Sequence, residues 1–90
     1  MTTYYKATFS DGTVLKRSTK HRTYTHAWLV RRKNNPDAVA KYGLREASDV
    51  FGFCGSEQLA HNTMPRYRYG EVLFAEIAPA VEVTSKEYRS

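Results

Sequence analysis

This 90-residue sequence contains a single cysteine, Cys54, so no disulfide within the chain can stabilise the fold. Small secreted domains usually depend on disulfides, and a reducing cytoplasm therefore suits this sequence better. The first residues contain no apolar run of the kind that a signal peptide requires. The longest apolar stretch, 72–83, includes Glu76 and Glu82 and is far shorter than the roughly 20 residues that span a bilayer. We therefore expect a cytoplasmic protein that has no membrane partner.

Motifs for catalysis and metal binding are also missing. The sequence has neither of the glycine patterns that bind nucleotide phosphates, and its carboxylates are scattered without an acid–base pair. The spacing of Cys54 with His21, His26 and His61 matches neither a zinc finger nor a zinc ribbon. A nucleophilic Cys54 needs a base within reach, and the surrounding Gly-Phe-Cys-Gly-Ser supplies none. We expect a buried apolar Cys54, no metal, no cofactor and no enzymatic activity; an enzyme that uses Cys54 is the weaker alternative.

Acidic residues are outnumbered by basic ones, nine against fourteen, which gives a net charge of +5. This balance excludes a DNA mimic built on negative charge and favours an acidic partner, either nucleic acid or a protein surface. Hydrophobic residues make up 41% of the chain and charged residues 26%, which is typical of a globular protein. The length predicts one small domain over residues 1–90 with a thin core.

The N-terminal residues predict a β-hairpin. The runs 4–9 and 13–17 are rich in strand-forming residues, and the Asp-Gly pair at 11–12 supplies the positive φ angles of a two-residue turn. A turn of that length places Phe9 opposite Val14.

Residues 23–32 predict a third strand, because aromatic and β-branched residues are frequent there. A helix capped by Thr23 or Thr25 is the alternative, since the segment contains no helix breaker. The two-residue period of a strand puts alternate residues on one face, namely Tyr24, His26, Trp28 and Val30. The opposite face then carries Thr25, Ala27, Leu29 and Arg31.

Two short helices are predicted in the middle of the chain. Asn35 is typical of a helix cap, Pro36 suits the first helical position, and Gly43 ends the helix after Tyr42. Ser56 caps a second short helix that runs to about residue 62.

The remaining segments complete the predicted fold. The glycines at 52 and 55 predict a loop, residues 71–84 predict one or two strands bent or broken at Pro79, and residues 85–88 predict a terminal helical turn. The sequence thus predicts a small α+β domain. It has an antiparallel sheet of three to five strands, an N-terminal hairpin and one or two short helices.

The positive charge is concentrated at the N-terminal end. Residues 1–33 carry a balance of +7, residues 34–65 a balance of −2, and residues 66–90 are neutral. We expect this region to contact an anionic partner, and the alternative is a solvated rim that keeps a small sheet soluble. The candidate contact residues are Lys16, Arg17, Lys20, Arg22, Arg31, Arg32 and Lys33.

A second candidate contact region alternates cations and aromatic rings. Arg66, Tyr67, Arg68 and Tyr69 follow a proline directly. Guanidinium groups bind phosphate or carboxylate, and tyrosine rings stack on bases. Arginine and tyrosine are also preferred anchors in protein interfaces, so both partners fit this motif.

Residues 4–13, 22–28 and 81–89 resemble small proteins carried by phages and mobile elements. Proteins of this size and source include anti-CRISPR proteins, which bind a defence complex and block it without chemistry. The resemblance covers the first third of the chain and its tail, and it carries over no functional residue. It implies a small stoichiometric inhibitor in the cytoplasm of a host cell.

Two functions follow as hypotheses. In the first, the protein docks on a protein complex of the host through its basic and aromatic surface. A CRISPR effector is one candidate target. In the second, it binds RNA or single-stranded DNA directly, with the cations on phosphates. The bases would then stack on Tyr24, Trp28, Tyr67 or Tyr69.

Overall fold

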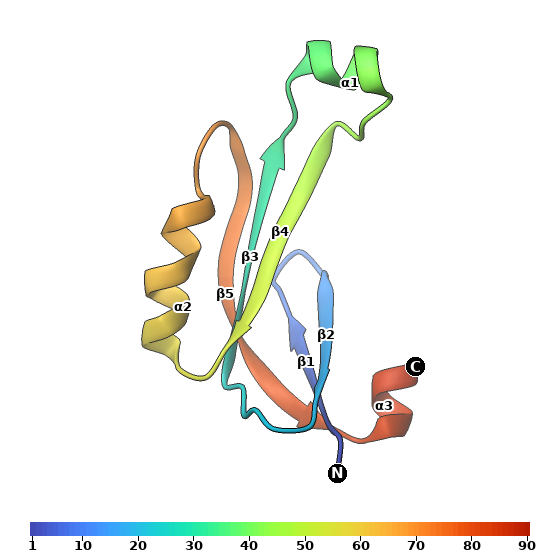
Figure 1. The fold of residues 1–90 in the computed structure, drawn as a ribbon, viewed down its shortest axis with the longest axis vertical. Coiled ribbons are helices and arrows are strands. Elements are labelled where there is room, and N and C mark those ends of the chain that lie inside the picture. The colour runs from blue at the N-terminus through green and yellow to red at the C-terminus, as the bar shows by residue number, and fades with distance from the viewer.

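A computed structural model describes all 90 residues, and Figure 1 shows one five-stranded antiparallel sheet with short helices at its margins. This arrangement confirms the predicted α+β class and the N-terminal hairpin. The strand order is β2-β1-β5-β3-β4. The elements are β1 (Thr3–Thr8), β2 (Val14–Thr19), β3 (His26–Lys33), α1 (Pro36–Tyr42), β4 (Ala47–Cys54), α2 (Glu57–Thr63), the 3₁₀ helix η1 (Met64–Tyr67), β5 (Val72–Val83) and α3 (Ser85–Arg89).

Strand β5 belongs to both halves of the sheet. Its first part, up to Pro79, pairs with β3, and the part from Ala80 to Val83 pairs with β1. Proline has no backbone N–H to donate, and it lies where the strand changes partner. The sequence predicted one or two strands here, and the structure has one continuous strand of 12 residues.

The two faces of the β5-β3-β4 half are covered by different elements. The β1–β2 hairpin covers one face, where Phe9 and Leu29 belong to a buried cluster. Helix α2 covers the other face, where its Ala60 packs with Trp28 and Val30. Figure 1 shows the hairpin and α2 on opposite sides of β4. The alternation predicted for residues 27–31 is therefore confirmed, because neighbouring residues of β3 enter different clusters.

Tyr24 departs from that alternation. It precedes β3, and its ring lies 5.4 Å from that of Tyr5 and 5.6 Å from that of Phe53, measured between centroids. Phe53 packs against the cluster on the hairpin face. The prediction that Tyr24 shares a face with Trp28 is wrong, because the regular strand period begins only at His26.

The hairpin turn has three residues instead of the predicted two. The Phe9 N–H donates to the Thr13 carbonyl at 2.9 Å, and Gly12, with φ of 90°, closes a turn onto the Phe9 carbonyl at 3.0 Å. Such a turn adds a bulge residue in the left-handed region, for which glycine is suited. The pairing therefore slips by one residue, so that Val14 lies opposite Thr8 instead of Phe9.

Both predicted helix starts are confirmed. The Asn35 side chain accepts a hydrogen bond from the Asp37 N–H, and Gly43 ends α1 with φ of 67°. Ser56 caps α2 by accepting from the Leu59 N–H. The predicted terminal turn is α3, where Thr84 and Glu87 form a capping box.

The loop predicted around residues 52–55 is wrong for most of its length, because β4 continues to Cys54. Gly52 lies opposite Trp28 in the ladder. A Cβ atom at Gly52 would lie 2.8 Å from the Trp28 Nε1 atom, so this glycine provides room for the indole ring. Gly52 thus marks the place where the Trp28 side chain closely approaches the backbone of β4.

The helices are short, and none is long and apolar enough to cross a membrane. Helix α1 contains no buried residue and lies at the end of an arm formed by β3 and β4, as Figure 1 shows. The termini and the connection between β2 and β3 lie at the other end of the molecule.

Candidate functional site

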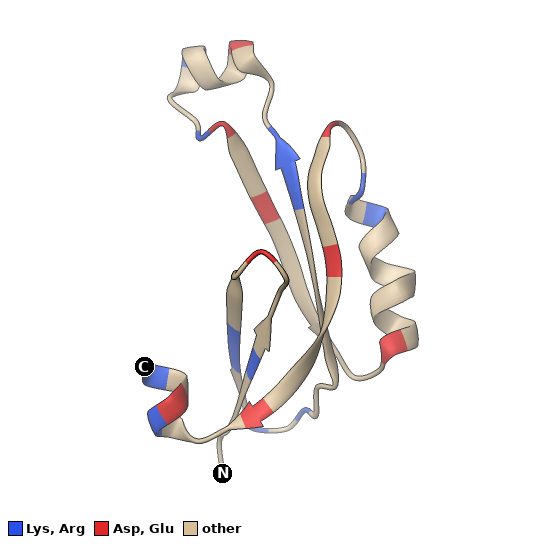
Figure 2. Ribbon diagram, turned by 180° about the vertical axis from the view of Figure 1, so that it is seen from behind, with Lys and Arg blue, Asp and Glu red and all other residues tan.

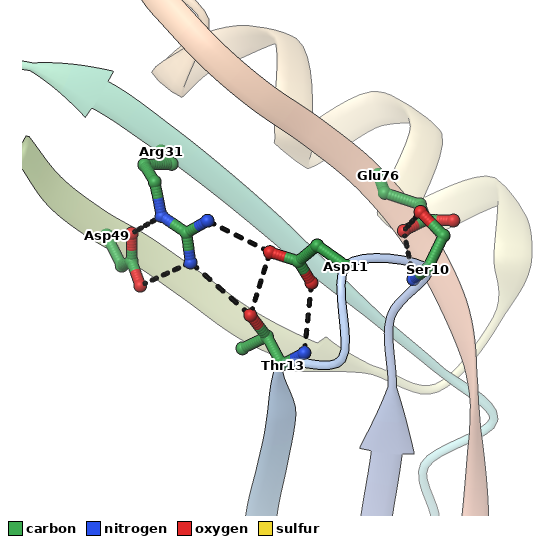
Figure 3. A network of polar contacts seen from close by, with 6 residues as sticks. All are labelled: Ser10, Asp11, Thr13, Arg31, Asp49 and Glu76. Atoms are coloured by element: carbon green, nitrogen blue, oxygen red, sulfur yellow. Dashed lines mark hydrogen bonds and ion pairs between the residues drawn. The ribbon is translucent and has the colours of Figure 1, made fainter.

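Arg31, one of the candidate contact residues, is held by two carboxylates on the hairpin face (Figure 3). Its Nε donates to Asp49 Oδ1 at 2.8 Å and its Nη1 to Asp11 Oδ2 at 2.9 Å. Its Nη2 also donates to Thr13 Oγ1 at 3.3 Å. The guanidinium thus joins the hairpin turn to β4. These contacts account for an arginine at this position, and no bound ligand is needed to explain it.

The ion pairs change the acidity of both partners. The two carboxylates raise the pKa of the Arg31 guanidinium, with Asp49 contributing more than Asp11. The pKa of Asp11 is lowered, chiefly by the hydrogen bond that its carboxylate accepts from the Thr13 N–H and further by Arg31. The hairpin turn is therefore held by a carboxylate that stays ionised below its usual range.

A second contact fixes the same turn. The backbone N–H and the hydroxyl of Ser10 donate to Glu76 Oε2 on β5, at 2.8 and 2.9 Å (Figure 3). The turn is thus tied to β3, β4 and β5 by side chains of opposite charge or polarity. Asp11 and Asp49 neutralise Arg31 within the molecule, and Glu76 adds a hydrogen-bonded anchor for the turn.

Arg32 and Lys33 do not extend a basic patch from Arg31. The Arg32 guanidinium lies 4.0 Å from the ring centroid of Tyr69 on the α2 face, which is a cation–π contact. Lys33 lies 3.9 Å from the Glu71 carboxylate, and both side chains are substantially exposed. Successive strand residues point to opposite faces, so Arg32 is separated from Arg31 and Lys33 and the three adjacent cations do not form one patch.

Each aromatic ring of the Arg66–Tyr69 motif packs one side against the protein and stays partly exposed. Tyr67 stacks on Trp28, with centroids 4.8 Å apart and the rings inclined by 16°, and Tyr69 lies against Arg32. Arg66 and Arg68 are exposed and form no ion pair. The rings therefore cover the margin of the core, and the two guanidinium groups remain free at the surface.

The hairpin cations divide between two faces of β2. Lys16 donates to the Ser90 carbonyl at 2.9 Å and lies beside Tyr88 of α3. Arg17 points to the other face, with its guanidinium 6.0 Å from the Tyr24 ring centroid. Both side chains therefore lie against an aromatic ring, Lys16 against Tyr88 and Arg17 against Tyr24.

The connection between β2 and β3 carries cations that lack acidic partners. Lys20 and Arg22 are exposed, and neither forms an ion pair, nor does Arg17 beside them. Figure 2 shows basic segments in this connection, at the end of the molecule that holds the termini. The uncompensated positive charge of the N-terminal region is therefore concentrated here.

Beside these cations lies a groove of about 370 Å³, which we call the Arg22 groove. It is formed where the β2–β3 connection passes the corner between β4 and α2. Arg22 stands at its polar side, and Leu59, with 53% of its surface exposed, offers an apolar side chain. The lining residues are Arg22, Thr23, Tyr24, Phe53, Cys54, Gly55, Leu59 and Thr63.

Cys54 also lines this groove, and it is half-buried against the Trp28 cluster. His26 lies opposite Cys54 in the ladder, and Glu57 lies 3.9 Å from the His26 Nε2 atom. No hydrogen bond joins the thiol to the imidazole, whose Nδ1 atom instead contacts Thr25 Oγ1 at 2.9 Å. No group of three metal-ligating side chains is present.

The fold thus brings together only part of the predicted contact set. Arg17, Lys20 and Arg22 lie at one end of β3, whereas Arg31, Arg32 and Lys33 lie at the other. Leu59 and Phe53, which also line the groove, were not predicted from the sequence. Leu59 is the one large apolar residue of a short helix, which was a signal for it, but only the fold places it beside Arg22.

No family model, curated protein or solved structure compared with this chain matches it.

Proposed function

We propose that this chain is a small non-enzymatic protein that docks on a partner protein through the Arg22 groove, and that it acts as a stoichiometric inhibitor of the anti-CRISPR kind. One observation carries the docking site: Arg22, an exposed cation without an acidic partner, lines a groove together with an exposed leucine. Arg17, which lies over the Tyr24 ring of the groove, and Lys20, two residues before Arg22, are also exposed and unpaired. The partner segment is expected to combine carboxylates with an apolar anchor.

Charge supports this assignment of the partner. Elsewhere in the N-terminal region the fold supplies acids, as Asp11 and Asp49 do for Arg31. Lys20 and Arg22 are exposed and have no such partners, so an acidic segment of another protein would supply the carboxylates that the fold does not. Complementary charge also accelerates encounter and rejects basic competitors.

The apolar part of the groove supports a protein partner over a nucleic acid. Leu59 is half-exposed next to the partly buried Phe53, and an apolar side chain of a partner would shield both from water. Interfaces between proteins place such an anchor at the centre and charged pairs at the rim. Phosphate groups gain nothing from an apolar groove.

Nucleic-acid binding remains the second candidate, on a different surface. Arg66 and Arg68 are exposed beside Tyr69, which is 59% exposed. Of the other rings that the hypothesis required, Tyr24 and Trp28 are only 7% and 4% exposed and cannot stack on a base. Tyr67 already uses one face on Trp28.

A peptide-display selection against the immobilised protein tests the proposal. We expect the selected peptides to contain carboxylates around an apolar residue, and their affinity to fall at least about tenfold for the variant Arg22→Glu. Leu59→Ser should weaken the same peptides without changing their salt dependence. Gel shifts with single-stranded DNA and RNA at low salt, measured in parallel, test the second candidate.

Arg66→Glu is the matched control, since it reverses one exposed charge away from the groove. Selected peptides without acidic residues, or peptides that bind Arg22→Glu as tightly as the unmodified protein, would contradict the groove as docking site. Tight, salt-sensitive binding of nucleic acid that Arg66→Glu abolishes would favour the second candidate instead.

A further inference from the structure

The two edge strands of the sheet, β2 and β4, are very different in chemistry. The β2 edge carries Lys16 and Arg17, and exposed charges of this kind prevent a second strand from pairing there. The β4 edge has no lysine and no proline, and Phe51 is 52% exposed on it. Its one charged residue, Asp49, is already paired with Arg31.

The hydrogen-bonding groups of β4 that face away from β3 can be assigned. Asn34 donates its backbone N–H to the Glu46 carbonyl, and the same register continues along both strands. Residues of an antiparallel pair alternate between bonding their partner and pointing away from it. Ser48, Val50 and Gly52 therefore bond β3, whereas the N–H and C=O groups of Asp49 and Phe51 point to the open edge.

This edge is not covered by another element. In Figure 1, β4 crosses in front of β3 and β5, with α2 on one side and the hairpin on the other. Those elements cover the two faces of the sheet and leave its edge open. A strand can therefore be added to β4 in the plane of the sheet.

We propose that the strand added to β4 is β4 of a second copy of this chain, paired antiparallel about a two-fold axis at Phe51. Such an axis keeps each residue on its own face of the combined ten-stranded sheet, with Phe51 opposite Phe51 and Asp49 opposite Phe53. Each outward-facing residue from 49 to 53 then meets another outward-facing residue, so the backbone groups of both edges are paired.

Neighbouring registers are less favourable. An axis at Asp49 would bring the two Asp49 carboxylates opposite one another, and like charges directly opposite destabilise a ladder. An axis at Val50 would place the exposed Phe51 ring opposite the Asp49 carboxylate. Only the axis at Phe51 places the two exposed aromatic rings against each other.

The same register brings no like charges together along the paired strands. Asp49 is the one charged residue of β4, and it is paired with Arg31 of its own chain. In the dimer it lies opposite Phe53 of the second copy, so no charge on one edge opposes the approach of the other.

Sedimentation equilibrium over a series of protein concentrations tests the proposal. We expect the mass to rise from the monomer value of 10.3 kDa to twice that value. Phe51→Lys should keep the protein monomeric over the whole series. Leu73→Lys is the matched control, because Leu73 has the same exposed fraction, 52%, and lies on β5; this variant should dimerise like the unmodified protein.

One further variant tests the register. In a Cys54→Ala background, Phe51→Cys should form a disulfide-linked dimer on mild oxidation, since directly opposed residues lie about 5.5 Å apart between Cα atoms. None of these residues is changed in the variants that test the Arg22 groove.

A mass of 10.3 kDa at every concentration would overturn the proposal, as would a dimer that persists in Phe51→Lys. Assemblies larger than a dimer would also overturn it, because an isologous pair of edges closes on itself. Crosslinking through Val50→Cys but not through Phe51→Cys would overturn the register.

Discussion

The two basic clusters of the N-terminal region have opposite roles, although the sequence presents them alike. In the cluster at residues 31–33, Asp49 and Asp11 pair with Arg31 and Glu71 with Lys33, while Arg32 lies over the Tyr69 ring. The cluster at Lys20 and Arg22 has no acidic partner in the fold. A high density of cations in a sequence therefore identifies a docking surface only where the fold leaves those cations uncompensated.

The difference arises from where each cluster lies relative to the sheet. Residues 31–33 belong to a central strand with neighbours on both sides, and the fold brings Asp49, Asp11 and the Tyr69 ring within reach of Arg31 and Arg32. Residues 20–22 belong to a connection at the end of the sheet, where water solvates the charges. We therefore expect the first cluster to contribute to stability, whereas the second is exposed and unpaired.

The largest effect is expected from Arg31→Leu. This variant removes the hydrogen bonds to both carboxylates and leaves Asp11 and Asp49 near one another without their shared cation. We expect the free energy of unfolding to fall by about 1–2 kcal/mol, because the network is partly exposed to solvent. Urea denaturation at neutral pH measures this change. Unchanged stability would show that Arg31 belongs with the free cations.

The acid dependence of stability gives a smaller and more specific effect. The pKa of Asp11 is lowered in the folded protein by Thr13 and Arg31, so the unfolded chain binds a proton at this carboxyl more readily. The stabilisation is present above the ordinary pKa of 3.8 and is lost as the pH falls through the lower value of the folded state.

The variant Asp11→Asn tests this dependence, since its side-chain oxygen can still accept the Thr13 N–H. In denaturation curves recorded from pH 7 to acid, the variant should lose less stability than the unmodified protein below about pH 4. Glu87, whose pKa is lowered by Thr84, should account for part of the remaining loss. An identical dependence of the free energy of unfolding on pH in the two proteins would contradict the role of Asp11.

The smallest effect on stability is expected for the double variant Lys20→Ala, Arg22→Ala. Neither side chain makes an ion pair, so the free energy of unfolding should change by less than about 0.5 kcal/mol. The same urea experiment measures it. A loss comparable to that of Arg31→Leu would show that this cluster too has a structural role, and the comparison between the clusters would fail.

Local signals in the sequence predicted most of the secondary structure. Asn35 with Pro36 and Ser56 marked helix starts correctly, because a capping side chain bonds the backbone two or three residues ahead and needs no distant contact. The strand through Trp28 was also correct. The alternation of its residues between two faces can be recognised in the sequence once both faces of the sheet are assumed to be covered.

The errors involved signals with more than one structural meaning. Asp-Gly is compatible with hairpin turns of two or three residues, and the structure uses the longer one, with Gly12 as the bulge residue. Gly52 was interpreted as a loop residue, whereas it provides room for the Trp28 ring across the ladder. Each choice depends on a partner strand that local sequence does not specify.

By itself the sequence determined the class of fold, the hairpin, the helix caps and the excess of positive charge, because these depend on composition and on interactions between near neighbours. Only the tertiary structure decided which cations are neutralised, which groove lies beside the free ones, and which sheet edge is left open. Asp11, Arg31 and Asp49 are far apart in the chain, and their charges cancel only when the hairpin packs on the sheet. The net charge of +5 is a property of the sequence, and its distribution over the surface is a property of the fold.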